Sequence, residues 1–183
     1  ERVSHPSIRR VLASEIGDDD AVFVAEAISG QTVSRRLRAG AIFTEREIVE
    51  TTRSLLEALV HAHAQGVVFG GIKPSNVLLR PSRCSGVLVN LPKPPLDVVS
   101  LTQAAAYLGI PHDCAPEVLA SGRFDARADL YGIGFVMWQM ATGTGAFRDH
   151  PNLADVLSLV IEEGLPPPES VNPDLHPSLA NYI

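Results

Sequence analysis

The stretch Gly66-Val-Val-Phe-Gly-Gly-Ile-Lys-Pro-Ser-Asn-Val-Leu-Leu79 decides how this chain folds. Its two ends are apolar and rich in valine, which predicts short strands at 67–69 and 76–80. Lys73 lies in the loop between these strands and Asn76 is the first residue of the second strand, in a region where loop residues often carry function. The segment is therefore the candidate functional site from which the rest of the chain is interpreted.

The helix before this stretch has the clearest signals in the chain. Thr44 is a good N-cap, and Glu47 three residues later completes a capping box. Phe43 and Ile48 are placed to form the accompanying hydrophobic staple. The helix is predicted to run up to Gly66, with one apolar face made of Leu55, Leu56, Leu59, Val60 and His63.

The other elements follow from turns and periodicity. We expect strands at 9–15 and 20–27 around a turn at 17–20, a helix at 32–39 ending at Gly40, and a strand at 86–89. Prolines interrupt the segment 91–95, which is predicted to be neither a helix nor the interior of a sheet. Residues 101–108 are predicted to form a short helix. An apolar helix at 127–142, ending at Gly143, is expected to be buried. A helix at 153–163 is closed by Gly164, and prolines 166–168 predict an extended connection. Strands first and helices later indicate an α+β fold with a helical body.

Composition limits the possible functions. With 183 residues, 45% hydrophobic and 20% charged, the chain fits one globular domain. Its net charge of -6 argues against nucleic-acid binding, so the arginines at 35, 36 and 38 are interpreted as a solvated helix face. No apolar run is long enough to cross a membrane. Cys84 and Cys114 are far apart and without metal-type spacing, which favours a reducing, cytoplasmic location.

Several motifs in order resemble a protein kinase of the bacterial Ser/Thr type. The kinase catalytic loop reads H-R-D-L-x-x-x-N, and here Phe69-Gly-Gly-Ile-Lys-Pro-Ser-Asn76 occupies that pattern. The other matches are His5-Pro-Ser-Ile8 before a small-lobe strand, Val22-Phe-Val-Ala-Glu26 entering the hinge, Ala115-Pro-Glu117 closing the activation segment, and Asp129-Leu-Tyr-Gly-Ile-Gly134 opening the central helix of the large lobe.

The resemblance implies a single incomplete kinase-like domain over residues 1–183. Residues 1–28 correspond to a remnant of the small lobe and the hinge, and 29–183 to the large lobe. A kinase also needs a Gly-rich phosphate loop and a strand lysine. This sequence has no such loop, and its two lysines, Lys73 and Lys93, both follow the hinge.

The departures from the family pattern concern the chemistry. Gly71 stands at the position of the catalytic Asp and cannot accept a proton, so no catalytic residue is assigned. Asn90 stands where the D-F-G Asp would ligate magnesium. Gly70 replaces the Arg that would bind a phosphorylated activation segment.

The resemblance also implies which residues would bind a nucleotide. Lys73 would contact the γ-phosphate and Asn76 a magnesium ion, whereas the structural alternative gives Lys73 a carboxylate partner and Asn76 a bond to the loop backbone. The remaining cofactor-binding positions are Asn90, the hinge residues Glu26 and Ile28, and Leu78. ATP and magnesium are expected only if a small lobe is present, and otherwise no cofactor is expected.

Two structural roles follow from the same resemblance. Asp129 is expected to accept backbone N–H groups of the catalytic loop. Glu117 is expected to lack its usual arginine partner.

Three functions remain open. The favoured one is a pseudokinase, a domain without phosphotransfer that binds a partner protein not identified by the sequence. The alternatives are a Ser/Thr kinase with residual activity and a nucleotide-binding module without turnover.

Overall fold

The computed structural model describes residues 3–17, 21–81, 85–90, 114–121, 125–145, 158–160, 162 and 164–183. The predictions for the turn at 17–20, the proline-rich segment 91–95 and the helix at 101–108 lie wholly or mostly outside these residues. Within them, helices form the body and two small antiparallel sheets lie beside it. This arrangement confirms the α+β prediction. None of the described helices is both long and apolar enough to span a bilayer.

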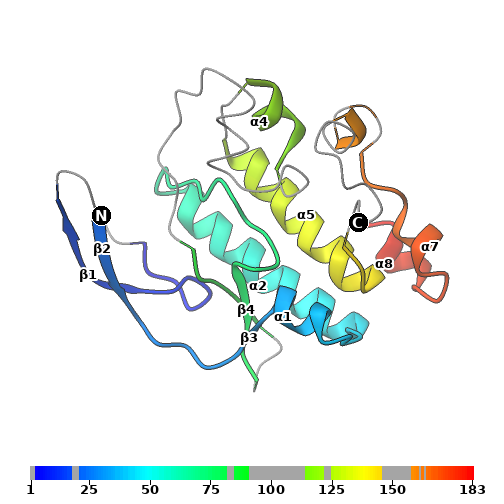
Figure 1. The fold of residues 1–183 in the computed structure, drawn as a ribbon, viewed down its shortest axis with the longest axis horizontal. Coiled ribbons are helices and arrows are strands. Elements are labelled where there is room, and N and C mark those ends of the chain that lie inside the picture. The colour runs from blue at the N-terminus through cyan, green and yellow to red at the C-terminus, as the bar shows by residue number, and fades with distance from the viewer. Residues whose placement is uncertain are drawn as a thin grey trace.

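Two helices form the centre of the body. Helix α2 (Glu45–His63) packs against α5 (Ala126–Thr142), and Figure 1 shows them side by side. As expected, α5 is largely buried and ends at Gly143, which has a left-handed φ of 70°. Leu130 differs from the expectation, because its side chain is 50% exposed. The short helix α1 (Val33–Arg38) lies within the range 32–39 predicted for it.

The start of α2 confirms the capping box. The Thr44 side chain accepts the Glu47 N–H at 3.2 Å, and Glu47 Oε2 accepts the Thr44 N–H at 2.9 Å. Phe43 and Ile48, the expected staple, are both buried in the main core. The predicted apolar face is partly wrong, since Leu56 and Val60 are exposed. The helix turns a neighbouring face inward, made of Ile48, Thr51, Leu55, Ala58, Leu59 and Ala62.

The strands divide into two separate sheets. Strands β1 (Val11–Ile16) and β2 (Ala21–Ala25) form an antiparallel hairpin that stands apart from the helices in Figure 1. Strands β3 (Gln31–Thr32), β4 (Val77–Leu79) and β5 (Gly86–Leu88) form the second sheet in that order. Residues 67–69, predicted as a strand, have no strand geometry.

Several short helices lie in the described residues after position 114. They are α4 (Pro116–Ser121), α7 (Pro168–Val171) and α8 (Pro177–Ala180). The extended connection expected at 166–168 is wrong at Pro168, which begins α7. Proline fits there because the first helical residue needs no N–H partner. Of the helix expected at 153–163, residues 158–160 and 162 are described as helical. Gly164 follows with a left-handed φ of 73°.

Candidate functional site

The loop that contains Gly71 is held from below by Asp129. This residue lies in the first turn of α5, and its side chain is fully buried. Its Oδ2 accepts the Phe69 N–H at 2.9 Å and its Oδ1 accepts the Gly70 N–H at 2.8 Å. These bonds confirm the role expected for Asp129. Within 67–69, where no strand forms, the Phe69 N–H goes to this carboxylate and the Val67 N–H goes to the Ala62 carbonyl, so neither is available to a sheet.

His63 is a second contact that the sequence did not reveal. The sequence placed it on the apolar face of its helix, but its Nε2 lies 2.9 Å from Asp129 Oδ2. A carboxylate accepts hydrogen bonds, so the ring nitrogen donates. The sequence offered one signal for this contact: His63 is a polar residue at the end of an otherwise apolar helical face. Asp129 is therefore joined both to the loop and to α2.

The loop backbone is tightly packed above this anchor. Phe69 and Ile72 are each 1% exposed, in agreement with the expectation that Phe69 belongs to the core. Gly70 has a φ of 62°, which a residue without a side chain adopts most readily. On α5, a Cβ built at Gly132 would lie 2.6 Å from the Ile72 carbonyl oxygen, so helix and loop touch at that point.

Asn76 follows the structural alternative. Its Nδ2 donates to the Gly71 carbonyl oxygen at 3.0 Å, and its backbone N–H donates to the Lys73 carbonyl at 2.8 Å. Its own carbonyl accepts the Val89 N–H at 3.0 Å, which brings the loop beside the residue that precedes Asn90. Lys73 is half-buried. The structure thus places Gly71, Lys73, Asn76 and Asn90 in one region.

Asn90 differs from its neighbours because its amide is unsatisfied. Both Nδ2 and Oδ1 are buried, and neither has a hydrogen-bond partner in the described part of the chain. A buried amide of this kind is rare and calls for an explanation such as a ligand or water.

These residues do not fit a magnesium ion. Such a cation is held by one or two carboxylates together with phosphates, whereas Asn76 and Asn90 offer neutral amides. Among the described residues, no group of three or more His, Cys, Asp or Glu side chains is arranged to hold a metal.

The residues expected at the hinge, Glu26 and Ile28, keep backbone groups that make no hydrogen bond to the described residues. The Glu26 N–H is already bonded to the Arg10 carbonyl at 2.9 Å, which leaves the Glu26 carbonyl. The backbone of Ile28 makes no hydrogen bond within the described residues. Leu78 is half-buried on β4 and lies against Gly30, where a built Cβ would be 2.6 Å from its Cδ2.

Glu117 is not free of interactions. Hydrogen bonding to Asp125 and the charge of Asp125 raise the pKa of Arg127, and the charge of Glu117 is a smaller contribution in the same direction. The expectation that Glu117 lacks its usual arginine partner stays a prediction. The arginine cluster of α1 is also only partly a solvated face, because Arg36 is half-buried and paired with Glu47 at 2.8 Å.

Comparison with known proteins agrees with this geometry. The family model described as protein kinase domain matches residues 1–175. The serine/threonine-protein kinase pkn3 of Myxococcus xanthus is 29% identical over 193 residues, which cover 100% of this chain and 35% of that protein. A probable serine/threonine-protein kinase PknB of Lactococcus lactis is 27% identical, over 99% of this chain and 29% of that protein.

A plant relative gives the same result. Mitogen-activated protein kinase kinase kinase 3 of Arabidopsis thaliana is 27% identical, over 95% of this chain and 27% of that protein. The chain spans about a third or less of the length of these three relatives. The division into a small-lobe remnant (1–28) and a large lobe (29–183) stays a prediction. From the match to the family model, the chain belongs to the protein kinase family.

Proposed function

We propose that this chain is a pseudokinase: a kinase-like domain that transfers no phosphate and binds a partner protein. The observation that carries the proposal is the glycine at position 71, where the family has its proton-accepting Asp. A general base contributes about a hundred- to ten-thousand-fold to a rate, and glycine has no group that can replace it. We also place the module in the cytoplasm, in accordance with two cysteines that are far apart in the sequence and lack metal-type spacing.

Nearby groups support inactivity because they are used for structure. Both carboxylate oxygens of Asp129 are engaged by the loop backbone, and the Asn76 amide nitrogen is bonded to the Gly71 carbonyl. An Asn in place of the metal-binding Asp removes a further charge that would stabilise the transferring phosphoryl group. A loop of kinase shape without its chemistry suits a domain that is retained for binding.

The experiment is a radiolabel assay with purified protein and ATP, run with magnesium and with manganese. We expect no phosphate on the protein itself or on a generic substrate. The Lys73→Ala variant is the matched control. Incorporation that is present in the parent and abolished by Lys73→Ala would establish the residual kinase instead.

The unsatisfied amide of Asn90 favours a second candidate, a nucleotide-binding module without turnover. A polar ligand would satisfy both buried atoms, and the unbonded backbone of Ile28 could bind adenine without any particular side chain. Ligand binding to the folded state raises the melting temperature with ligand concentration. A rise with ATP that persists without magnesium and is reduced in Asn90→Leu would support this candidate. We expect a weak or absent rise.

A further inference from the structure

A polar pocket lies where α1 and α5, which pack against each other, both end. Its volume is about 610 Å³, within the range of about 300–1,000 Å³ typical of small-molecule sites. None of its lining residues belongs to the loop that contains Gly71. The space is large enough for a small molecule or for the last few residues of a peptide.

Gln139 brings an unsatisfied amide to this pocket. The residue lines the pocket and is only 8% exposed, yet its side chain has no hydrogen-bond partner among the described residues. Burying an amide without a partner costs free energy, and such groups are rare in proteins. A carboxamide both donates and accepts. An extended peptide residue matches it, because that residue presents its N–H and its C=O to the same side, as in paired antiparallel strands.

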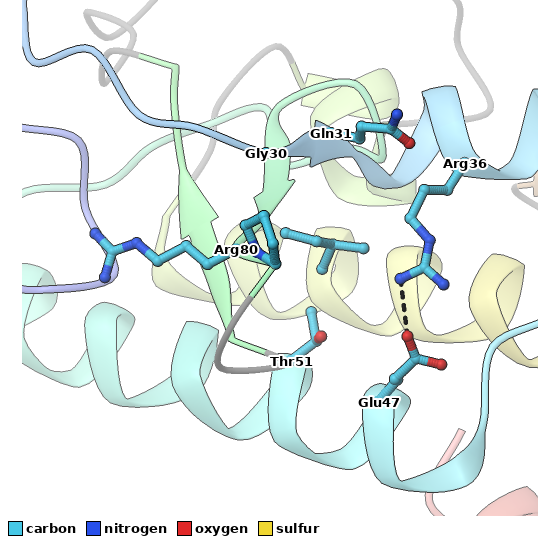
Figure 2. Close-up of a pocket in the computed structure, with 8 residues that line it drawn as sticks. Gly30, Gln31, Arg36, Glu47, Thr51 and Arg80 are labelled. Atoms are coloured by element: carbon cyan, nitrogen blue, oxygen red, sulfur yellow. Dashed lines mark hydrogen bonds and ion pairs between the residues drawn. The ribbon is translucent and has the colours of Figure 1, made fainter.

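Arg38 gives the pocket a positive charge without a counter-ion. It is the only charged residue among those that line the pocket. Its Nε donates to the Ser34 carbonyl at 3.4 Å, and it forms no ion pair with a carboxylate of the described residues. Figure 2 shows the contrast with Arg36 on the same helix, whose guanidinium pairs with Glu47 at 2.8 Å. The two terminal nitrogens of Arg38 therefore remain able to hold a carboxylate through two parallel hydrogen bonds.

The two helix ends restrict the ligand further. Helix α1 ends at Arg38 and α5 at Thr142, so both C-termini border the pocket. A helix C-terminus carries a partial negative charge of about half a unit. Such ends attract N–H donors and disfavour an anion anywhere except beside Arg38. The pocket thus suits a ligand with a single carboxylate and neighbouring N–H groups, and it does not suit a chain of phosphates.

Bare backbone forms much of the remaining wall. Gly40, Gly143 and Gly145 line the pocket, and a Cβ built at any of them would meet nothing within 4 Å. The lining has one apolar side chain, the half-buried Leu37. The pocket therefore offers little to an apolar anchor. Its contacts suit the main chain of a ligand better than a particular side chain.

We infer that this pocket, the Gln139 pocket, binds the C-terminus of a partner protein. Arg38 holds the terminal carboxylate, and Gln139 pairs with the N–H and C=O of the residue before it. A protein C-terminus carries the single carboxylate and the N–H donors that the lining selects. The inference rests on the proposed function, since it names the surface and the partner chemistry of the binding module.

An NMR titration of isotope-labelled protein with three glycine–serine hexapeptides tests the inference. The first peptide ends in a free carboxylate and the second in a C-terminal amide. The third ends in a free carboxylate but has N-methylglycine as its penultimate residue, which removes the N–H that faces Gln139. We expect the first to shift the backbone signals of Gly143 and Gly145 saturably, and the other two to bind about tenfold more weakly. Equal binding of the amidated peptide, or no saturable shift at about 10 mM of the first peptide, would overturn the inference.

Free N-acetylglycine distinguishes a peptide terminus from a small carboxylate. It has the terminal carboxylate and one amide, but it lacks the penultimate residue whose N–H and C=O would pair with Gln139. We expect it to bind about tenfold more weakly than the first hexapeptide. Equal affinity would assign the pocket to a small carboxylate and overturn the assignment to a partner protein.

Variants locate the binding. Arg38→Gln removes the charge and should weaken the first hexapeptide by about tenfold. Arg35→Gln is the matched control, because Arg35 is exposed on the same helix and does not line the pocket, and it should leave affinity unchanged. Gln139→Leu should abolish the difference between the first and the N-methylated peptide. Equal losses in Arg38→Gln and Arg35→Gln, or a difference that persists in Gln139→Leu, would contradict the assignment.

The two proposals fail separately. A protein that transfers phosphate and still binds the first hexapeptide contradicts the pseudokinase assignment alone. A protein that is inert in the radiolabel assay and ignores this peptide contradicts the Gln139 pocket alone.

Discussion

Asp129 and Gly70 are joined by a buried hydrogen bond of 2.8 Å from the Gly70 N–H to Oδ1, across 59 residues of sequence. The bond fixes the shape of the loop from beneath and does not involve the side chain at position 71. The shape of the loop therefore does not depend on which side chain stands at position 71.

The first prediction concerns this anchor. In Asp129→Asn, the amide oxygen alone must accept hydrogen bonds from two backbone N–H groups and from the His63 ring. The amide NH₂ group would then face other donors and lack an acceptor. An unsatisfied buried donor costs about 1–3 kcal/mol, so we expect unfolding free energy to fall by at least about 2 kcal/mol in urea denaturation. Asp174→Asn, at an exposed residue, is the control and should change it little. A loss of similar size in both variants would contradict the anchoring role.

The second prediction compares two glycines on α5. A Cβ at Gly132 would lie 2.6 Å from the Ile72 carbonyl oxygen, whereas one at Gly134 would meet nothing within 4 Å. Gly132→Ala should lower the unfolding free energy by about 1–3 kcal/mol through overpacking. Gly134→Ala should raise it by up to about 1 kcal/mol, because alanine favours helix. Chemical denaturation of both variants provides the measurement. An unchanged unfolding free energy in Gly132→Ala would show that α5 and the loop are not in contact.

Sequence reasoning succeeded where a local motif fixes the structure. The capping box at Thr44 is such a motif. The bonds of Asp129 to the loop were expected only from the resemblance to the kinase family, because their partners lie 59 and 60 residues away. Sequence reasoning failed where tertiary contacts choose between alternatives. Periodicity could not tell that Leu56 would be exposed, since neighbouring faces of α2 are both apolar. It also missed the His63 contact, because the partner lies 66 residues away.

The third prediction tests the capping box of α2. Thr44→Ala removes the acceptor for the Glu47 N–H, and the loss of such a cap costs about 0.5–2 kcal/mol. Burial raises the pKa of Glu47, but hydrogen bonds from Thr44 and Arg36 outweigh it and lower the pKa overall. Thr52→Ala, within the same helix, is the control and should not destabilise. Equal unfolding free energies for Thr44→Ala and the parent would contradict the cap.

The fourth prediction concerns the pH dependence of stability. Burial, and then the charge of His61, lower the pKa of His5 below its ordinary value of about 6.5. The Ser7 N–H donates to His5 Nδ1 at 3.1 Å, and the two imidazole rings lie 5.6 Å apart. A lowered pKa means that the unfolded chain binds the proton more readily. The contribution of His5 to the free energy of unfolding is therefore fully present above the ordinary pKa. It is lost as the pH falls through the lowered pKa of the folded state.

Melting temperatures between pH 8 and pH 5, a range of about 3 units that brackets the ordinary pKa, provide the measurement. The parent should lose stability toward acid more steeply than His5→Asn, whose amide oxygen can still accept the Ser7 N–H without titrating. Only the difference between the two slopes is assigned to His5, because other groups titrate in both proteins. Parallel curves would contradict the pKa shift.

The fifth prediction is that restoring two carboxylates does not restore a kinase. In Gly71→Asp combined with Asn90→Asp, a base and a metal ligand return, and a base is worth about a hundred- to ten-thousand-fold. Phosphoryl transfer also depends on holding the phosphates with a Gly-rich loop and a strand lysine, and this sequence carries neither before its hinge. We expect no transfer in the radiolabel assay, with the melting temperature confirming that the variant is folded. Transfer by the double variant would show that residues 1–183 can position ATP without a Gly-rich loop or a strand lysine.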